Sequence, residues 1–231
     1  MSGGLLLVGA HVGDMDFTAG HLALVHARAG EEVTLLHLTA GEGGHPGKGP
    51  ATYREQKVGE AAQAAARLGA ECRILGYRDG DLSASAEVAR SVADVVDELS
   101  PAVVVTHWRG SLHRDHANCY FAVERALEQA STQPAVLYAD NWEDADGFSP
   151  DVVVDVSAVF DEWLEAARCH ELFRGGVVNF DYQGYYEALA ALRGRMSGVE
   201  KAAAFMRPPR VFFSPARKLG GDGPVERADQ P

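Results

Sequence analysis

Two short clusters of histidine and aspartate lie roughly 100 residues apart in this chain of 231 residues. The first occupies residues 11–14 (His-Val-Gly-Asp) and directly follows the apolar run 5–10. The second occupies residues 113–116 (His-Arg-Asp-His) and follows the β-branched run 102–106 after a short loop. Imidazole and carboxylate groups are common zinc ligands, and a catalytic zinc site keeps three protein ligands and one position for water. The clusters therefore predict a metal site suited to hydrolysis.

Both clusters stand where a strand of an open α/β sheet would end. Parallel strands in such a sheet deliver side chains to one crevice at their carboxyl ends, so we expect His11, Asp14 and His116 to converge there on one metal ion. His113 and Asp115 are then placed beside the ligands, where they orient them or act on the transition state. Short motifs of this kind often match by chance. The occurrence of two clusters at two strand ends is what favours a real site.

The rest of the sequence alternates between strand and helix patterns. We predict strands at residues 5–10, 32–38, 71–75, 102–106 and 135–138, and helices at 18–29, 53–68, 85–99 and 115–130. This alternation is typical of an α/β protein with right-handed crossovers, so we expect a Rossmann-like, mostly parallel sheet with helices on both faces. Further elements are predicted at 152–154 (strand), 159–173 and 184–194 (helices). We expect a single domain over residues 1–219 and a disordered tail at 220–231.

Composition restricts the functions that this chain can have. The net charge of −12 argues against binding to nucleic acids or anionic membranes, which favour basic surfaces. The first apolar run is too short to cross a bilayer, so we expect no membrane insertion. The three cysteines are odd in number and widely spaced, which indicates free thiols in a reducing compartment. We therefore expect a cytoplasmic protein that acts on a small molecule, and the sequence is compatible with a homo-oligomer.

These residues resemble the motifs of a known enzyme family. Residues 10–14 (Ala-His-Val-Gly-Asp), followed by Thr-Ala-Gly at 18–20, resemble the opening motif A-H-P-D-D of the PIG-L (LmbE-like) deacetylases. Residues 113–116 resemble their H-P-D-H motif. Further matches, in the same order, are Thr39, Gly41, Arg54, Gly-Tyr-Arg-Asp-Gly at 76–80, Asn-Trp-Glu-Asp at 141–144 and the segment 198–205. The resemblance extends from residue 5 to about residue 206.

The resemblance implies hydrolysis of N-acetyl groups on amino sugars by a zinc-bound water, with a cationic imidazole sharing the charge of the oxyanion. Another divalent ion also suits these ligand types. The residues that match the family's functional positions are the zinc ligands His11, Asp14 and His116, the oxyanion-stabilising His113 with Asp115 to orient it, and the sugar contacts Arg54 and Asp79. Trp142 and tyrosines at 182, 185 and 186 present aromatic faces on which a sugar ring could stack.

The sequence departs from the family at one chemically important position. The first Asp of A-H-P-D-D is the family's general base, and here that position is Gly13. A glycine cannot accept a proton, and losing a positioned general base costs about 10²- to 10⁴-fold in rate. Three interpretations remain open. Asp16 or another acid acts as the base, zinc-bound hydroxide with His113 suffices, or the chain does not hydrolyse its ligand at all.

We therefore expect a zinc-dependent hydrolase, of the metal-dependent amidohydrolase type, that removes an N-acetyl or other N-acyl group from an amino sugar or a related small molecule. The alternative is a degenerate family member that binds zinc or carbohydrate without deacetylating it, because Gly13 replaces the general base.

Overall fold

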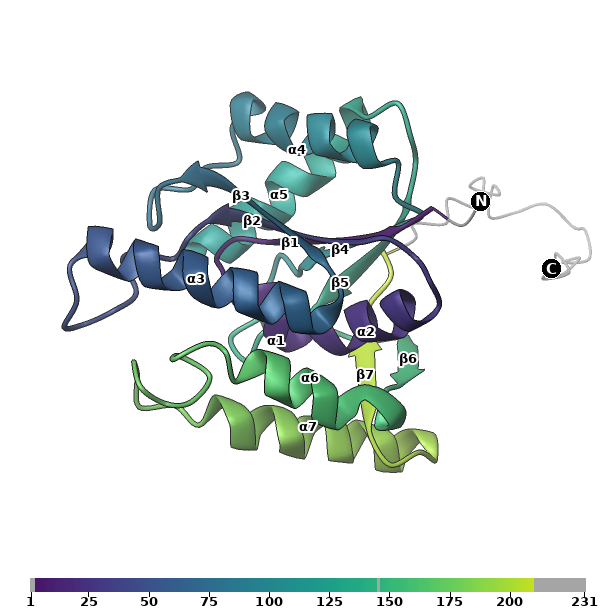
Figure 1. Cartoon of the computed structure of the whole chain (residues 1–231). Coiled ribbons are helices and arrows are strands. Elements are labelled where there is room, and N and C mark those ends of the chain that lie inside the picture. Colours follow the sequence, from purple (N-terminus) through teal and green to yellow (C-terminus); the bar gives the residue numbers. More distant parts are fainter. Residues whose placement is uncertain (1–2, 145, 210–231) are drawn as a thin grey trace, which may run out of the picture.

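A five-stranded parallel sheet forms the centre of the molecule (Figure 1). The structure is a computed structural model that describes residues 3–144 and 146–209. The strands lie side by side in the order β3-β2-β1-β4-β5. Their bounds are β1 Leu5–Gly9, β2 Val33–Thr39, β3 Glu71–Tyr77, β4 Val103–His107 and β5 Ala135–Ala139. The expected α/β fold with a mostly parallel sheet is confirmed.

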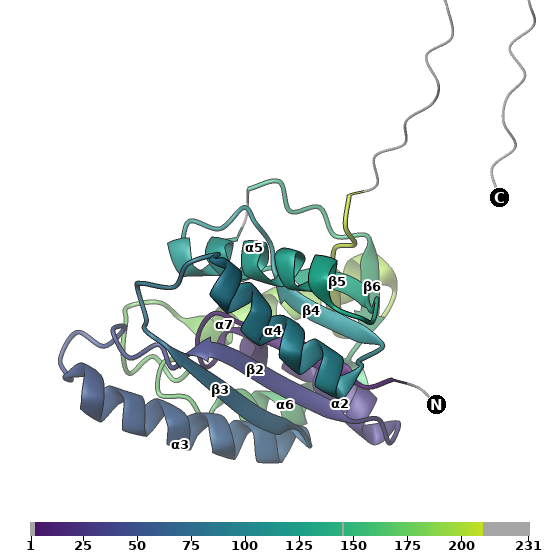
Figure 2. The ribbon, with the colours of Figure 1, turned by 90° about the horizontal axis from the view of Figure 1, so that it is seen from above.

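Helices cover both faces of this sheet (Figures 1 and 2). On one face lie α4 and α5, and on the other lie α2 and α3. The bounds of the helices are α1 Asp14–Thr18, α2 Gly20–Arg28, α3 Pro50–Leu68, α4 Ala86–Leu99, α5 Arg114–Gln129, α6 Phe160–Ala167 and α7 Tyr182–Ser197. Along β1, Leu6 and Val8 belong to the core under α4 and α5, whereas Leu5 and Leu7 belong to the opposite core. Successive strand side chains point to opposite faces, and both faces of β1 are buried in a core. β1 is therefore apolar throughout.

The C-terminal part of the chain adds a further layer outside α2 and α3. It consists of α6, α7 and a small antiparallel pair, β6 (Val152–Asp155) and β7 (Ala202–Phe205). Trp163 of α6 is buried and its indole Nε1 donates a hydrogen bond to the carbonyl of Asp16 at 2.8 Å. This contact ties the added layer to the short helix that follows β1.

Several elements differ from the sequence-based expectations. The predicted helix at 18–29 is two helices, because α1 already begins at Asp14 and the chain turns at Ala19 before α2. The predicted helix at 159–173 is shorter, since α6 ends at Ala167, and β7 was not predicted. The expected tail at 220–231 lies outside the described residues. Within residues 3–144 and 146–209, none of the helices has the length and apolar composition required to cross a bilayer.

Candidate metal centre and its cavity

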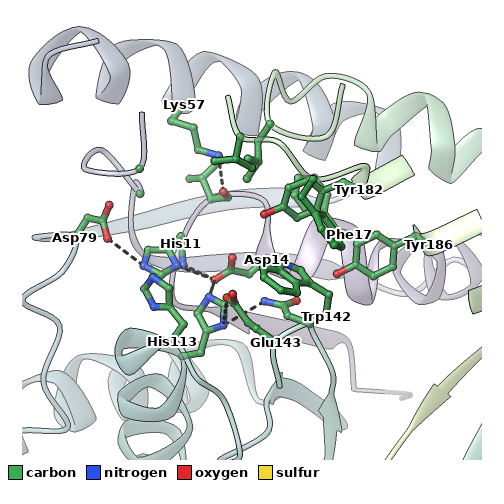
Figure 3. Close-up of a pocket in the computed structure, with 18 of the residues that line it drawn as sticks. His11, Asp14, Phe17, Lys57, Asp79, His113, Trp142, Glu143, Tyr182 and Tyr186 are labelled. Carbon is green, nitrogen blue, oxygen red and sulfur yellow. Dashed lines mark hydrogen bonds and ion pairs between the residues drawn. The ribbon is translucent and has the colours of Figure 1, made fainter. Parts of the chain in front are cut away.

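The two predicted clusters meet at the carboxyl edge of the sheet, in a cavity of about 480 Å³ (Figure 3). β1 ends at Gly9 and α1 begins at Asp14, so the short turn between them carries both His11 and Asp14 into the cavity. β4 ends at His107, and α5 begins directly after His113. Because β1 and β4 are neighbours in the sheet, side chains far apart in the sequence come together here.

The carboxylate of Asp14 is the centre of the site. Its Oδ2 atom lies 3.2 Å from His11 Nδ1, 3.4 Å from His116 Nε2 and 3.1 Å from His107 Nε2. In a tetrahedral zinc site with ligand bonds of about 2.0–2.1 Å, two ligand atoms lie about 3.3 Å apart. The separations of His11 Nδ1 and His116 Nε2 from this oxygen each match the spacing of two ligand atoms on one ion, and they are also the distances of a hydrogen bond and an ion pair.

In the described part of the chain, His11, Asp14 and His116 together are not one of the groups of three residues whose ligand atoms all lie within 4.8 Å of one another. Among the described residues, three groups have ligand atoms within 4.8 Å of one another: His11 with His113 and His116, Asp14 with His107 and His116, and His11 with Asp79 and Asp115. His107 is the less suitable ligand, because its Nε2 accepts the backbone N–H of Ala10 at 3.1 Å. A ring nitrogen that accepts a hydrogen bond has no lone pair left for a metal ion. His107 therefore does not bind the metal; it donates from Nδ1 to Asp144 and fixes the backbone of Ala10, next to His11, through Nε2.

The residue behind these ligands is the buried Asp144. Its Oδ1 lies 3.3 Å from His116 Nδ1, and its Oδ2 lies 3.2 Å from His107 Nδ1. A carboxylate that accepts the Nδ1 hydrogen of a histidine fixes the ring and leaves the Nε2 lone pair for a metal. Asp144 thus orients His116 toward Asp14.

The protonation equilibria of the ligands suit the binding of a cation. Burial raises the pKa of Asp14, but the charges of His116 and His11 outweigh it and hold that pKa well below its usual value. Burial lowers the pKa of His116, but Asp14 and Asp144 outweigh it and raise the pKa to about 9. Metal ions bind deprotonated imidazole and release its proton. A divalent cation can therefore replace these protons as the partner of Asp14.

His113 lies beside the ligands, with its ring centroid 4.8 Å from that of His11 and 4.6 Å from that of His116. The backbone N–H of Asp115 donates to its Nδ1 at 3.3 Å, so Nε2 carries the hydrogen of the neutral ring. Burial lowers the pKa of His113, and the charges of His11 and His116 lower it further. The geometry favours a neutral hydrogen-bond donor here, in place of the cationic imidazole expected from the sequence.

The carboxylate of Asp115 faces His11 rather than the His113 ring. Its Oδ2 accepts the backbone N–H of Gly80 at 2.7 Å and lies 3.4 Å from His11 Nε2. Asp115 therefore contacts His113 through its backbone and orients His11 through its side chain.

Two of the three predicted substrate contacts line the cavity. Asp79 places Oδ1 3.1 Å from His11 Nε2, and its Oδ2 accepts the N–H of Gly43 at 2.7 Å. Trp142 also lines the cavity and stacks on Phe180 with ring centroids 4.5 Å apart. Arg54 is not among the lining residues, and its guanidinium lies 3.6 Å from Glu42 at the surface.

Asp16 lies beneath the cavity and not in it. It is 1 % exposed, its Oδ1 lies 3.1 Å from His170 Nε2, and its Oδ2 lies 3.8 Å from His37 Nε2. Burial raises the pKa of Asp16, but the charge and hydrogen bond of His170 outweigh burial and hold the pKa at about 2. A fully buried carboxylate bonded to another side chain does not support the expectation that Asp16 replaces the general base.

Position 13 lies next to the ligand cluster and has little room for a side chain. Gly13 has a φ of +107°, which favours glycine, and a Cβ there would lie 3.0 Å from Phe17 Cζ and 3.6 Å from Lys57 Nζ. Lys57 is 2 % exposed and donates from Nζ to the carbonyl of Val12 at 2.6 Å. The cavity thus presents an ammonium group next to position 13, where the resemblance described above implies a carboxylate.

Sequence reasoning missed four residues of this site: His107, Lys57, Glu143 and Asp144, the last of which belongs to the 141–144 motif. Each had a signal. His107 directly follows the predicted buried strand 102–106, which is a usual place for a functional side chain. Lys57 follows Tyr53 by one helical turn, on the face of α3 that is buried. Glu143 belongs to the 141–144 motif; it lines the cavity, its Oε1 lies 3.4 Å from His116 Nδ1, and burial raises its pKa.

An aromatic wall faces the ligands across the cavity (Figure 3). Its residues are Phe17, Tyr53, Trp142, Phe180, Tyr182 and Tyr186. Flat apolar walls with a few convergent polar groups are typical of small-molecule sites. The cavity therefore combines a metal-type cluster on one side with a surface for a ring or an apolar group on the other.

Comparison with known proteins identifies the segment that carries both clusters. Residues 6–127 match the PIG-L family, which is described as GlcNAc-PI de-N-acetylase.

Individual relatives carry different activities. Over 159 residues the chain is 33% identical to the 1D-myo-inositol 2-acetamido-2-deoxy-alpha-D-glucopyranoside deacetylase 2 of Catenulispora acidiphila, in a match that covers 54% of this chain and 51% of that protein. Over 184 residues it is 23% identical to the 4-oxalmesaconate hydratase of Pseudomonas putida, in a match that covers 71% of each. The chain therefore spans about half the length of the first of these curated relatives.

A solved structure shares the fold. The N,N'-diacetylchitobiose deacetylase of Pyrococcus horikoshii superposes with a TM-score of 0.78 at 19% identity, over 90% of this chain and 84% of that one.

Proposed function

This chain belongs to the PIG-L family, and from that premise we propose that it is a metal-dependent hydrolase that removes an N-acyl group from an amino sugar or a related small molecule. The observation that carries the proposal is the convergence of His11 Nδ1 and His116 Nε2 on a single oxygen of Asp14. The deacetylase relative, which acts on an acetamido sugar, supports this assignment.

In this proposal His11, Asp14 and His116 hold the ion, while His107 and Asp144 orient them. A zinc ion held there would supply the polarisation of an amide carbonyl and would lower the pKa of a water molecule to roughly 7. His113 then donates its Nε2 hydrogen to the carbonyl oxygen of the substrate, because its Nδ1 is occupied by the backbone of Asp115. A donor that faces the developing oxyanion stabilises the transition state more than the ground state.

The proton of the attacking water needs an acceptor other than residue 13. Apart from Asp14, the carboxylates that line the cavity among the described residues are Asp79 and Glu143. Both oxygens of Asp79 are engaged, one by His11 and the other by the backbone of Gly43. Glu143 contacts His116 through one oxygen only, and burial raises its pKa, which makes it a better base. We therefore assign the proton-accepting role to Glu143.

An amine-release assay over a panel of N-acetyl amino sugars tests this proposal. The protein is stripped with a chelator, reloaded with zinc and compared with the stripped sample. Turnover by the reloaded protein alone is expected, and Glu143→Gln should lower kcat by about 10²- to 10⁴-fold at unchanged metal content. Glu128→Gln, an exposed position on α5, is the matched control. Metal retention without amine release from any N-acetyl compound would contradict the hydrolase and favour the binding-only alternative.

A second candidate function is the addition of water to an unsaturated acid. The relative with the larger shared coverage of the two is a hydratase, and Gly13 removes the carboxylate on which the family's deacetylation depends. The same zinc-loaded protein distinguishes the two candidates. Loss of the ultraviolet absorbance of 4-oxalmesaconate, without amine release from N-acetyl sugars, would favour hydration over hydrolysis.

A further inference from the structure

Lys57 is a buried cation that the proposed chemistry does not use. It lies in the middle of α3 and lines the cavity that holds His11 and Asp14 (Figure 3). Its side chain is 2 % exposed. An amine on a flexible stem is normally found at the surface, and its burial is costly unless it is paired. We therefore expect Lys57 to have a charged or hydrogen-bonding partner at the cavity wall.

The protein itself satisfies only part of the hydrogen-bonding capacity of Lys57 Nζ. Nζ donates one hydrogen bond, to the carbonyl of Val12 at 2.6 Å. Among the described residues, no carboxylate oxygen lies within the 4.0 Å of Lys57 Nζ that defines an ion pair. An ammonium has three hydrogens to donate, so two remain for a group inside the cavity. Burial lowers the pKa of Lys57, and the acidic residues Glu60, Asp14 and Asp16 around it oppose that effect.

Room for such a group is provided by the cavity itself, because Lys57 is one of its lining residues. Gly13 has no side chain, and the place of its missing Cβ is 3.6 Å from Lys57 Nζ. Phe17, whose Cζ is 3.0 Å from the place of that Cβ, and Tyr182 also line the cavity, and neither offers a negative charge. An anionic group bound there would satisfy the two free donors and lie next to the ligand cluster.

We propose that Lys57 binds a carboxylate of the substrate, so that this site takes an N-acylated amino sugar or related small molecule that carries an acidic group. This inference rests on the proposed function, because it places the scissile amide at the ligand cluster and the acid at Lys57. A carboxylate fits the two remaining N–H donors with charge-assisted hydrogen bonds. A divalent ion at Asp14 offsets the negative charges of the cavity and favours the entry of an acid.

A matched pair of ligands tests the inference by calorimetric titration of the zinc-loaded protein. The pair is N-acetylmuramic acid and its carboxamide, which differ only in whether a carboxylate is present. The wild type should bind the acid about 10- to 100-fold more tightly than the amide, as expected for a charge-assisted hydrogen bond in a buried site. Lys57→Met should lose this preference. Lys48→Met is the control, because Lys48 pairs with Gln56 and Glu171 outside the cavity, and it should keep the preference.

A second variant keeps the test valid if Lys57→Met does not fold. Gly13→Asp leaves Lys57 in place and supplies a carboxylate from the chain itself, so it should also lose the preference for the acid. Equal or absent binding of acid and amide by the wild type would overturn the inference, as would a preference that survives in both variants.

The outcome is separable from that of the proposed function. Amine release measured on the same samples decides whether the protein is a hydrolase. A preference for the acid that depends on Lys57, without amine release, would leave the inference standing and contradict the hydrolase. Amine release that is equal from acid and amide and unchanged in Lys57→Met would support the hydrolase and contradict the inference about Lys57.

Discussion

Replacing Asp16 with asparagine is expected to destabilise the fold and to leave the metal in place. Burial raises the pKa of Asp16, but the charge and hydrogen bond of His170 hold it at about 2, against a usual value of 3.8. Each pKa unit corresponds to about 1.36 kcal/mol, so the ionised carboxylate contributes about 2 kcal/mol to the free energy of unfolding. Asp16 is 1 % exposed, and solvent therefore screens this contribution little.

The dependence on pH follows from the direction of the shift. Because the pKa is lower in the folded than in the unfolded chain, the contribution is complete above pH 3.8 and is lost as the pH falls toward about 2. Urea unfolding at neutral pH should show Asp16→Asn about 2 kcal/mol less stable than the wild type, and the gap should narrow in acid. Asp94→Asn, at an exposed position of α4, should change stability by less than about 0.5 kcal/mol.

The same variant separates a structural role of Asp16 from a catalytic one. If Asp16 is structural, the folded Asp16→Asn protein keeps its bound metal and its kcat. Wild-type stability together with a kcat lowered by about 10²-fold or more would refute this reasoning and identify Asp16 as the base.

Three further substitutions test other parts of the site. His107→Asn removes the ring between Asp14 and Asp144, so it should weaken zinc binding about 10- to 100-fold in competition with a chromophoric chelator; unchanged affinity would contradict the positioning role. Trp142→Ala should raise KM and leave kcat within about twofold in steady-state kinetics, and a lower kcat at constant KM would argue against a binding wall. Gly13→Asp should lower the free energy of unfolding by about 1–2 kcal/mol in urea, since the φ of residue 13 is positive. The new carboxylate should pair with Lys57, which makes it a weak base. Gly13→Asp/Lys57→Met should therefore release amine faster than Gly13→Asp alone, and slower release by the double variant would rule out that pairing.

The sheet could be predicted from the sequence because β1 and most of β4 are apolar on both faces. Leu5 to Val8 and Val103 to Val105 form unbroken apolar runs, and such runs separated by helical patterns are typical of parallel sheets. The polar clusters follow the ends of two of these strands in the sequence. Because the strands are parallel, both clusters are then expected at the carboxyl edge of the sheet. This is why the sequence predicted that His11, Asp14 and His116 would meet.

The surroundings of the ligands could not be predicted in the same way. The start of α1 has no capping side chain, because Gly13 precedes it. The sequence therefore lacks the usual N-cap signal for this helix. Whether Asp16 points into the cavity or toward His170 depends on the packing of α6 and the segment after it, more than 150 residues away along the chain. The burial of Lys57 depends likewise on contacts across the fold. A sequence pattern shows which residues share a helix face, but it does not show which residues pack against that face.

Metal stoichiometry tests the central claim most directly. We predict that zinc-reconstituted wild-type protein, after removal of free ion, holds one divalent ion per chain by elemental analysis. Folded Asp14→Asn and His116→Ala proteins should hold almost none. Wild-type protein that takes up no ion, or folded variants that still hold a full equivalent, would contradict the assignment of His11, Asp14 and His116 as the metal site.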